Sequence, residues 1–475
     1  MLCGGVLLAG YPWAAWLLAK NPRDDGRWLT LLVGFAFSLG ALTLVMFWEA
    51  GLGLLFDLWT ITLPMALLAL VGLLLWGRQT RSEESGTPTR NSHWLRKVAG
   101  GLTILVSATI LFNAAYWPFS RPDVLGIYGR YGRLMWITQT LVSFERDDFF
   151  YQTYPVLVPL TYPYAYLASG WQNEYLAHTI STLMSLACLP AVYLLARMMA
   201  GWQAAWLSMV LLALTPTFSR WASSGYVDLP MAFFFTMSAI FAWRVWYSGH
   251  WTDALLAGAM MGLAAWTKNA ALFGTAVLVA WLLWLRIRGD ISTGLIATAL
   301  SACAAIAAPW YIYTYAEARM IIPPTAWISQ AQPNLENLLI LISHPEIFGL
   351  PGWVILVGLA ATAFSRARGR ETAKGILLLL WTAPFFLVWW WLLSYDPRFI
   401  LMFLPPLTVI GGAWAARQWA ALPEQWQGRL LPLLLLLGCI LAAQVAWNSV
   451  EFKDNLLRNP LMSHEEKLSV IAGDS

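Results

Sequence analysis

Charged residues are scarce in this sequence. Only 11% of its 475 residues are Asp, Glu, Lys or Arg, whereas soluble domains carry about a quarter. Hydrophobic residues make up 59% of the chain, and 30 residues are tryptophan. Apolar runs of about 20 residues, each long enough to cross a hydrocarbon core of about 30 Å, recur along the whole length. The shortage of charge therefore excludes a soluble globular protein and indicates a protein embedded in a membrane.

Cysteine is also rare, and several common motifs are missing. The four cysteines, Cys3, Cys188, Cys303 and Cys439, each stand alone in an apolar run. This pattern contains neither a disulfide framework nor a metal-binding pair, so we expect all four to be buried small hydrophobic residues. No Walker motif, glycine-rich dinucleotide loop or HExxH sequence is present. Nucleotide hydrolysis and zinc proteolysis are therefore unsupported, and no feature indicates a nucleic-acid partner.

What the sequence does contain is a long series of hydrophobic runs. A backbone surrounded by lipid must satisfy its own hydrogen bonds, so each run is expected to be a helix. The predicted fold class is all-α integral membrane, a polytopic bundle of about 14 transmembrane helices. The first run has no basic region ahead of it and no small-residue cleavage site. We therefore expect a retained helix there and not a signal peptide.

Polar segments divide the chain into four predicted parts. These are three leading transmembrane helices in residues 1–76, a cytoplasmic linker in 77–97, the main transmembrane region in 98–448 and an extracytoplasmic tail in 449–475. The linker is rich in Ser, Thr and Arg, a composition typical of flexible connections. The tail is polar and amphipathic, and the sequence gives it no role.

Lys and Arg set the predicted orientation, because cytoplasmic loops carry an excess of them. Most of these residues fall on one set of loops, which includes 77–97 and 366–374. The segments 119–172 and 317–347 then face outward, as do both termini. Within the first of these, the stretch YGRYGRLMWITQTL has an amphipathic pattern that suits a helix lying in the interface plane.

Four charged residues stand at ends of apolar runs on the predicted outer side: Asp123, Asp228, Lys268 and Arg398. A carboxylate beside the membrane core is costly unless it is paired or used. Four helix ends that meet on one side are what an outward-facing active site requires. Simpler roles stay open, namely snorkelling anchors for the two cations, an N-cap for Asp228 and a solvated turn for Asp123.

Six segments, in order along the chain, resemble motifs of the GT-C-type membrane glycosyltransferases, in the bacterial group related to protein O-mannosyltransferases and aminoarabinose transferases. The most similar is LLALTPTFSRWASSGYVDLPMAFFF, which holds Asp228 in the place of the family's second acidic residue. RPDVLGIYGRYGRLM holds Asp123 in the place of the first. The other segments are TYPVLVPLTYPYAYLASG, GLAAWTKNAALFG, AAPWYIYTYAEARMIIPP and DPRFILMFLPPL. Together they span roughly residues 100–415.

The sequence departs from the family pattern at three points. Val124 follows Asp123 where the family often has a second acidic residue, which weakens a two-carboxylate first motif. Asn269 follows Lys268 where glycine is usual. Three hydrophobic runs also precede the region of resemblance.

The resemblance implies a GT-C-like catalytic region in residues 98–448. Such an enzyme moves a sugar, with inversion, from a polyprenyl-phosphate-linked donor to a glycan, lipid or protein acceptor. Transfer takes place at the extracytoplasmic face of a bacterial plasma membrane. Neither the sugar nor the acceptor follows from the sequence.

The chemistry needs a base for the acceptor hydroxyl and fixed positive charge for the leaving phosphate. We expect Asp123 to be the base and Asp228 to orient donor or acceptor. The expected site residues are the catalytic carboxylates Asp123 and Asp228, the phosphate-binding cations Lys268, Arg398 and Arg133, and the pocket tyrosines Tyr128, Tyr226 and Tyr395. The resemblance makes no cofactor certain, and a divalent metal on the acidic pair is left open.

Tyr128 and neighbouring outer tyrosines also suit an interfacial aromatic belt. Two functions other than an enzyme stay open. A non-catalytic GT-C-like scaffold would explain Val124. A lipid-sugar flippase or another transporter would also have many helices. Transporters, however, usually place charges near the bilayer midplane on broken helices, and here the charges lie at helix ends.

Overall fold

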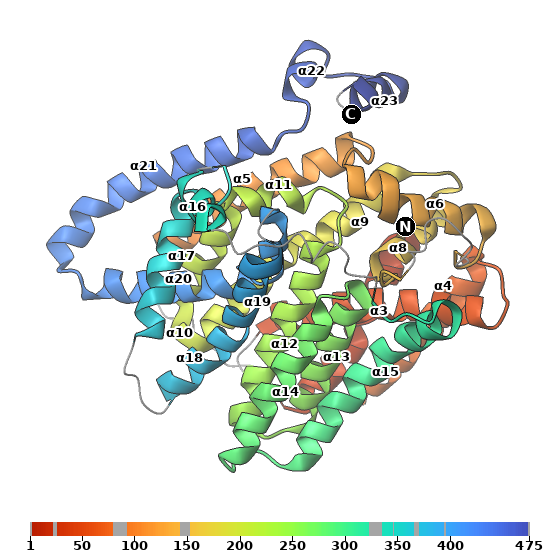
Figure 1. Ribbon diagram of the computed structural model, residues 1–475, viewed down its shortest axis with the longest axis horizontal. Coiled ribbons are helices and arrows are strands. Elements are labelled where there is room, and N and C mark those ends of the chain that lie inside the picture. Colours follow the sequence, from red (N-terminus) through yellow and green to blue (C-terminus); the bar gives the residue numbers. More distant parts are fainter. Residues whose placement is uncertain are drawn as a thin grey trace.

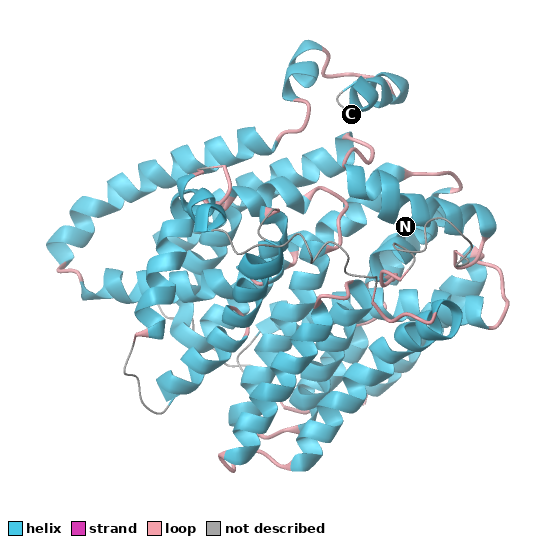
Figure 2. Ribbon diagram, viewed as in Figure 1, coloured by secondary structure: helices cyan, strands magenta, loops and turns pink. Residues whose placement is uncertain are grey.

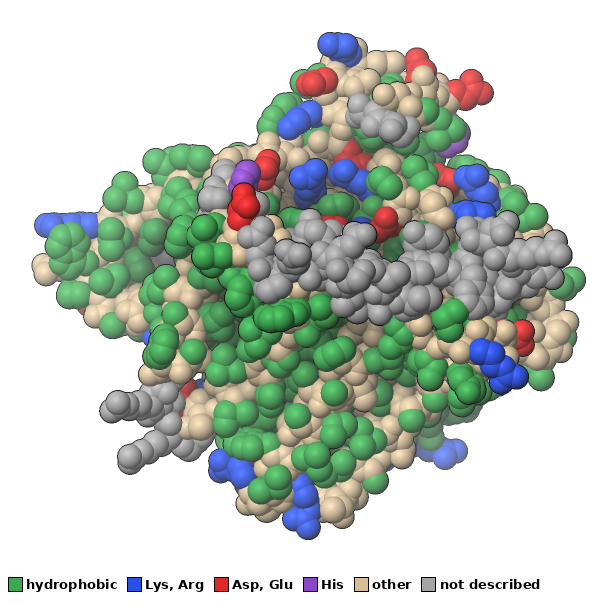
Figure 3. All heavy atoms as spheres, in the orientation of Figure 1, with side chains coloured by type: hydrophobic (Ala, Val, Ile, Leu, Met, Phe, Trp, Pro, Cys, Tyr) green, Lys and Arg blue, Asp and Glu red, His purple; other side chains and the backbone are tan. Residues whose placement is uncertain are grey.

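The computed structural model of the protein describes residues 2–21, 26–78, 93–142, 153–322, 335–344, 346–364, 370–393 and 396–473. These residues form helices joined by short loops, and none of them forms a strand (Figures 1 and 2). The predicted all-α fold class is therefore confirmed. Hydrophobic side chains cover most of the lower body, and charged ones gather at the upper end and the lower tip (Figure 3).

The helices follow one another along the whole chain. The leading helices are α1 (Leu2–Leu7), α2 (Tyr11–Ala19), α3 (Gly26–Gly51) and α4 (Leu58–Gly77). Next come α5 (His93–Tyr116), the π-helical turn η1 (Val124–Tyr128), α6 (Gly129–Thr138), α8 (Leu157–Ser169), α9 (Glu174–Leu186), α10 (Cys188–Ala213) and α11 (Pro216–Ala222). The centre holds α12 (Asp228–Ser248), α13 (Trp251–Thr267), α14 (Ala271–Ile287) and α15 (Thr293–Ala318).

The last third of the chain is more broken. It comprises α16 (Leu335–Ser343), α17 (Gly349–Ala363), α18 (Arg370–Leu380), α19 (Ala383–Val388), the π-helical turn η3 (Trp389–Leu393) and the 3₁₀ turn η4 (Pro397–Met402). It ends with α20 (Leu404–Ala421), α21 (Glu424–Ser449), α22 (Lys453–Arg458) and α23 (His464–Gly473).

Eight helical stretches among the described residues are long and apolar enough to cross a membrane. The predicted number of fourteen is not confirmed. Some predicted spans are short helices, such as α14 and α17, and the first run is broken between α1 and α2. Another, Glu174–Ala213, runs through α9 and α10 as one 40-residue stretch. Hydrophobicity alone does not show where a helix breaks or continues.

Helix α12 is the centre of the bundle. In its most apolar stretch, 94% of residues are buried inside the protein. It packs against α10 and α13, and α13 packs in turn on α15 (Figure 1). The closest approach is at Gly258 of α13, where an added Cβ would overlap the backbone of Ala299 on α15. Small residues at helix contacts of this kind let membrane helices pack backbone to backbone.

The leading helices join this bundle instead of standing apart. The Trp266 indole of α13 donates a hydrogen bond to Thr43 Oγ1 of α3 at 3.1 Å. The Phe47 ring packs edge-on against the same indole, with 5.1 Å between centroids. Residues 79–92, most of the predicted linker 77–97, lie outside the described residues.

The expectation for the cysteines holds for two of them. Cys188 and Cys303 are buried, but Cys439 is exposed. It lies on α21, whose most apolar stretch is only 17% buried inside the protein. An apolar helix in a membrane can turn most of its surface away from the protein core, so hydrophobicity did not predict burial at this position. The Cys3 side chain lies outside the described part of the structure.

The directions of the helices bring several helix ends together at one end of the bundle. Helix α5 ends there, α12 begins there and α13 returns there (Figure 1). The turn η4, which precedes α20, packs against α12 and α11. The predicted interfacial helix is α6, which directly follows η1. Helices α22 and α23 lie beyond this same end, at the top of Figure 1. The candidate site is built from these ends.

Candidate functional site

The first feature of the site is an ion pair between the loop after α5 and the turn η4. Arg398 Nη1 lies 2.5 Å from Asp123 Oδ2, although 275 residues separate them. Arg398 Nη2 lies 3.4 Å from Asp396 Oδ2. Asp396 also accepts a hydrogen bond from the Arg398 backbone N–H at 2.8 Å, which caps η4. The Asp123 side chain keeps 34% of its surface exposed, against 12% for Arg398.

A second, more deeply buried ion pair lies beside the first. Lys268 Nζ is 2.5 Å from Asp228 Oδ1, and these side chains are 11% and 4% exposed. Lys268 directly follows α13, as the sequence predicted. Asp228 is the first residue of α12 and Val227 holds the N-cap position, with no side-chain cap. The N-cap role is therefore wrong, although the carboxylate still lies at the positive end of the helix dipole.

One aromatic ring connects the two pairs. The Phe399 ring centroid is 4.9 Å from Lys268 Nζ and 4.9 Å from Arg398 Cζ. Both cations thus share a cation–π contact with the same ring. Burial lowers the pKa of Arg398, but Asp228, Asp123 and Asp396 outweigh it and raise that pKa overall. The guanidinium is therefore a permanent positive charge.

Tyr226 supports the loop that carries Asp123. Its hydroxyl accepts a hydrogen bond from the Asp123 backbone N–H at 3.1 Å. Its ring stacks on Trp221 with 5.2 Å between centroids and lies 4.7 Å from Arg398 Cζ. Burial raises the pKa of Tyr226 to about 12, so the phenol stays neutral at physiological pH.

Tyr128 is buried inside the site, only 4% exposed, and is not part of an outer aromatic belt. Its ring packs against Tyr226 with 6.2 Å between centroids. Burial, together with the Asp228 carboxylate, raises its pKa well above the ordinary value. The third predicted pocket tyrosine, Tyr395, lies outside the described residues.

A glycine lets the turn before α12 fit beneath the Asp123 loop. Gly225 has a φ of +75°, in the left-handed region that side chains rarely adopt. A Cβ there would also stand 3.0 Å from both Phe119 and Val124. The Gly225 carbonyl accepts a hydrogen bond from Tyr162 at 2.8 Å. Another residue at this turn would be strained at this φ and would have to displace the Phe119 or Val124 side chain.

Arg133 makes a different contact from the other predicted cations. Its Nη2 lies 2.9 Å from Glu174 Oε1, at the start of α9. The second oxygen of Glu174 accepts the Phe119 backbone N–H at 3.3 Å. Arg133 therefore supports the loop between α5 and Asp123, and its binding of phosphate stays a prediction. Sequence reasoning did not single out Glu174.

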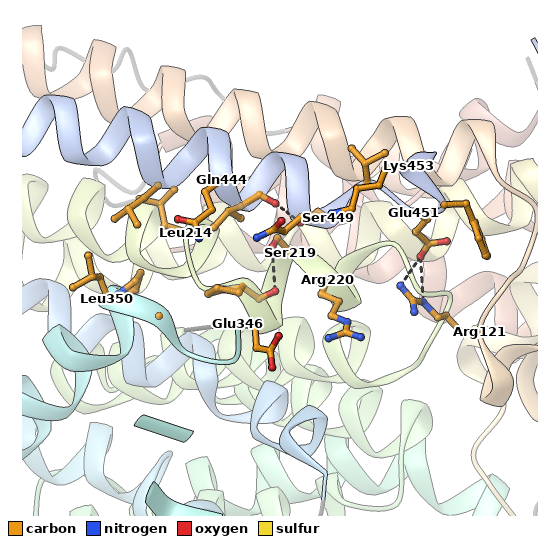
Figure 4. Close-up of a pocket in the computed structure, with 18 of the residues that line it drawn as sticks. Arg121, Leu214, Ser219, Arg220, Glu346, Leu350, Gln444, Ser449, Glu451 and Lys453 are labelled. Atoms are coloured by element: carbon orange, nitrogen blue, oxygen red, sulfur yellow. Dashed lines mark hydrogen bonds and ion pairs between the residues drawn. The ribbon is translucent and has the colours of Figure 1, made fainter. Parts of the chain in front are cut away.

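A cavity of about 720 Å³ lies next to the Asp123 loop. Ser120 and Arg121 line it, and so do Arg220 of α11 and the last turns of α21 (Figure 4). Its other walls come from the start of α17 and from residues 450–453. The Trp221 ring lies 5.6 Å from Arg121 Cζ, in the cavity wall, and 5.6 Å from Arg398 Cζ, in the first ion pair.

Within the described part of the chain, no three His, Cys, Asp or Glu side chains lie close enough to hold a metal ion. The carboxylates of Asp123 and Asp228 each contact a cation instead.

Residues 166–313 match the family model described as dolichyl-phosphate-mannose-protein mannosyltransferase. The computed structure is similar to that of ArnT from Cupriavidus metallidurans bound to undecaprenyl phosphate, with a TM-score of 0.54 and 18% identity over 74% of this chain and 64% of that one. This chain has the GT-C glycosyltransferase fold.

A second GT-C neighbour is more distant in sequence. The archaeal oligosaccharyltransferase AglB from Archaeoglobus fulgidus, in complex with an inhibitory peptide and a dolichol-phosphate, gives a TM-score of 0.52 and 12% identity over 75% of this chain. The chain spans 64% of the ArnT structure and 56% of the AglB structure. No curated protein sequence matches the chain significantly.

The matched segment contains only half of the candidate site described above. Asp228 and Lys268 lie within residues 166–313, whereas Asp123 and Arg398 lie on either side of them. The structure, and not the family match, brings the two halves together.

Proposed function

We propose that this chain is a membrane glycosyltransferase that transfers a sugar, with inversion, from a polyprenyl-phosphate-linked donor to an acceptor hydroxyl. One observation carries the proposal. Two cations and two carboxylates, from four distant parts of the chain, form adjacent ion pairs around Phe399 at one end of the bundle. Two fixed positive charges beside an accessible carboxylate are what cleavage of a sugar–phosphate bond requires.

The cations suit the leaving phosphate. When the bond between the anomeric carbon and the phosphate oxygen breaks, its electron pair remains on the phosphate. Arg398 can hold two phosphate oxygens with its planar fork, and Lys268 adds a point charge. In the structure, a carboxylate holds each cation in place. When the donor binds, its phosphate either replaces this carboxylate as the partner of the cation or shares the cation with it.

The two carboxylates differ in access. Asp123 keeps 34% of its side-chain surface exposed, whereas Asp228 keeps 4%. We therefore assign Asp123 as the base that takes the acceptor's proton while the acceptor oxygen bonds to the anomeric carbon. Asp228 holds Lys268. Once phosphate occupies Arg398, an oxygen of Asp123 is released to receive that proton.

The cavity beside Asp123 suits the acceptor. Inversion requires attack from the side opposite the leaving phosphate. Ser120 and Arg121, which come just before Asp123 in the chain, line the cavity wall. Its volume of about 720 Å³ is within the usual range for ligand sites. The acceptor in this proposal is a glycan, lipid or protein that offers a hydroxyl group.

The comparisons support a lipid-phosphate donor. Two solved neighbours with this fold were determined with undecaprenyl phosphate and with dolichol-phosphate. We place the site at the extracytoplasmic face of a plasma membrane, as the distribution of Lys and Arg predicts.

Binding of undecaprenyl phosphate to the purified protein tests this proposal. Native mass spectrometry should show a complex that is weakened about tenfold or more in Lys268→Ala, because a charge-assisted contact to phosphate is removed. Arg288→Ala is the matched control, since Arg288 pairs with Asp290 at the far end of α14. Equal loss in both variants, or no binding by the wild type, would refute the donor assignment.

A further inference from the structure

The segment after α21, to which the sequence gives no role, reaches back to the loop of the proposed base. Glu451 is the centre of this contact and is 6% exposed. Its Oε2 accepts a hydrogen bond from Ser120 Oγ at 2.8 Å, and its Oε1 lies 3.0 Å from Arg121 Nη2. Both partners come just before Asp123, and Figure 4 shows the carboxylate and the Arg121 guanidinium facing each other.

The backbone around Glu451 is also fixed. Asn113 of α5 is fully buried. Its Nδ2 donates to the Ser449 carbonyl at 2.6 Å, and its Oδ1 accepts the Glu451 backbone N–H at 3.3 Å. One side chain of α5 therefore binds the chain on both sides of Val450, which directly follows α21. This arrangement holds the Glu451 backbone independently of the side-chain contact with Arg121.

The backbone conformation of Phe452 indicates that surrounding contacts hold the segment after α21 in place. It adopts a φ of +45°, in the left-handed region that is unfavourable for a bulky residue. Its ring packs on Trp117, with 4.9 Å between centroids. Such a conformation persists only where surrounding contacts over-determine it, and these conformations cluster at functional sites.

Helix α23 provides a second attachment. Lys467 Nζ lies 3.8 Å from the centre of the Tyr116 ring, at the end of α5. The Tyr116 hydroxyl donates to the Pro460 carbonyl at 3.0 Å, and Tyr175 of α9 contacts His464 at 2.8 Å. The segment thus spans from α21 across the ends of α5 and α9.

The contacts continue from Glu451 to the reacting groups. Arg121 is held by Glu451 and faces the Trp221 ring. Trp221 stacks on Tyr226, whose hydroxyl binds the Asp123 backbone. We infer that Glu451 is a positioning residue, which holds the Asp123 loop through Arg121 and Ser120 and so keeps the base beside Arg398. This inference rests on the proposed function for its catalytic part, but not for its structural part.

Two readouts test the inference on the full chain. The first is hydrogen–deuterium exchange of peptides covering residues 120–128, which needs no turnover. Exchange there should be at least about tenfold faster in Glu451→Ala than in the wild type, since a tenfold change corresponds to 1.4 kcal/mol of opening free energy. Glu465→Gln, on the exposed face of α23, is the control. Unchanged exchange in Glu451→Ala would overturn the inference whatever the enzyme does.

The second readout separates positioning from general destabilisation. With an undecaprenyl-phosphate-linked labelled sugar, Glu451→Gln should lower kcat about tenfold and leave KM for the donor and the melting temperature unchanged. The charge-swapped double variant, Arg121→Glu with Glu451→Arg, should have a higher kcat than either single swap, because the ion pair is re-formed. A loss of kcat that follows the melting temperature and is not recovered by the swap would overturn the inference.

Failure of the proposed function would look different. If the wild type neither binds undecaprenyl phosphate nor transfers sugar, the catalytic part of the inference falls with it. Faster exchange of residues 120–128 in Glu451→Ala would still show that Glu451 holds the loop. If Glu451→Ala does not fold, Glu451→Gln and the charge swap carry the same test.

Discussion

At the scale of single residues, the site combines groups with permanent charge and groups that stay neutral. Arg398 has a raised pKa because three carboxylates surround it, and Tyr128 and Tyr226 have raised pKa values because they are buried. Arg398 is thus a permanent charge held by carboxylates, and the neighbouring phenols stay neutral. In the proposed function, the donor phosphate meets cations that are already in place, and this avoids the cost of reorganisation.

Arg398→Ala should weaken binding of undecaprenyl phosphate by about 10- to 100-fold, as expected for one charged hydrogen bond. Arg398→Lys should recover only part of the affinity, because the point charge is restored and the two-bond fork is not. Titration of the purified variants by native mass spectrometry checks both. Full affinity in Arg398→Ala would remove Arg398 from the donor site.

Tyr226 should make stability fall at alkaline pH. An unfolded tyrosine ionises near pH 10, whereas burial raises the pKa of Tyr226 to about 12 in the folded protein. Between these values the unfolded state binds fewer protons, so rising pH favours unfolding. Thermal melts above pH 10 should therefore decline less steeply for Tyr226→Phe than for the wild type. An equal decline of melting temperature with pH in both proteins would contradict the buried environment of this phenol.

At the scale of elements, the sequence predicted what depends on local composition. It gave the positions of α6, of Lys268 after α13 and of Asp228 at the start of α12 because apolar runs and charges mark these boundaries. It could not show that η4 is a 3₁₀ turn capped by Asp396, or that η1 is π-helical. These depend on contacts between distant segments, which a single sequence does not reveal.

The contact between α13 and α15 gives a prediction at this scale. Gly258→Ala should lower the stability of the protein by about 1–3 kcal/mol, the usual cost of overpacking, because the new Cβ would overlap the Ala299 backbone. Gly101→Ala in α5 is the matched control, since no atom lies within 4 Å of its Cβ position. Thermal melts in detergent measure the difference. Equal stability of the two variants would show that the helices are farther apart.

At the scale of the whole molecule, the site depends on pairings that only the fold creates. Glu451 meets Arg121 across 330 residues, and Arg398 meets Asp123 across 275. Sequence reasoning found Asp123 and Arg398 because both carry charge beside apolar runs. It gave no role to Glu451, because an acidic residue in a polar tail is ordinary.

The orientation of the whole molecule is a separate prediction. In intact cells, a thiol reagent that does not cross membranes should modify Ser463→Cys, near α23, in a background without other cysteines. Arg288→Cys, at the far end of α14, should react only after permeabilisation. These outcomes follow from the excess of Lys and Arg on cytoplasmic loops. The reverse pattern would place the ion pairs on the cytoplasmic side.

The proposed chemistry as a whole is best tested by turnover of Asp123→Asn, measured as transfer from an undecaprenyl-phosphate-linked labelled sugar in membranes with matched protein levels. Asparagine keeps the shape of the side chain but cannot take a proton. Transfer should fall by about 10²–10⁴-fold, the usual contribution of a general base, while the variant still binds undecaprenyl phosphate. Wild-type turnover by Asp123→Asn would contradict the assignment of Asp123 as the base.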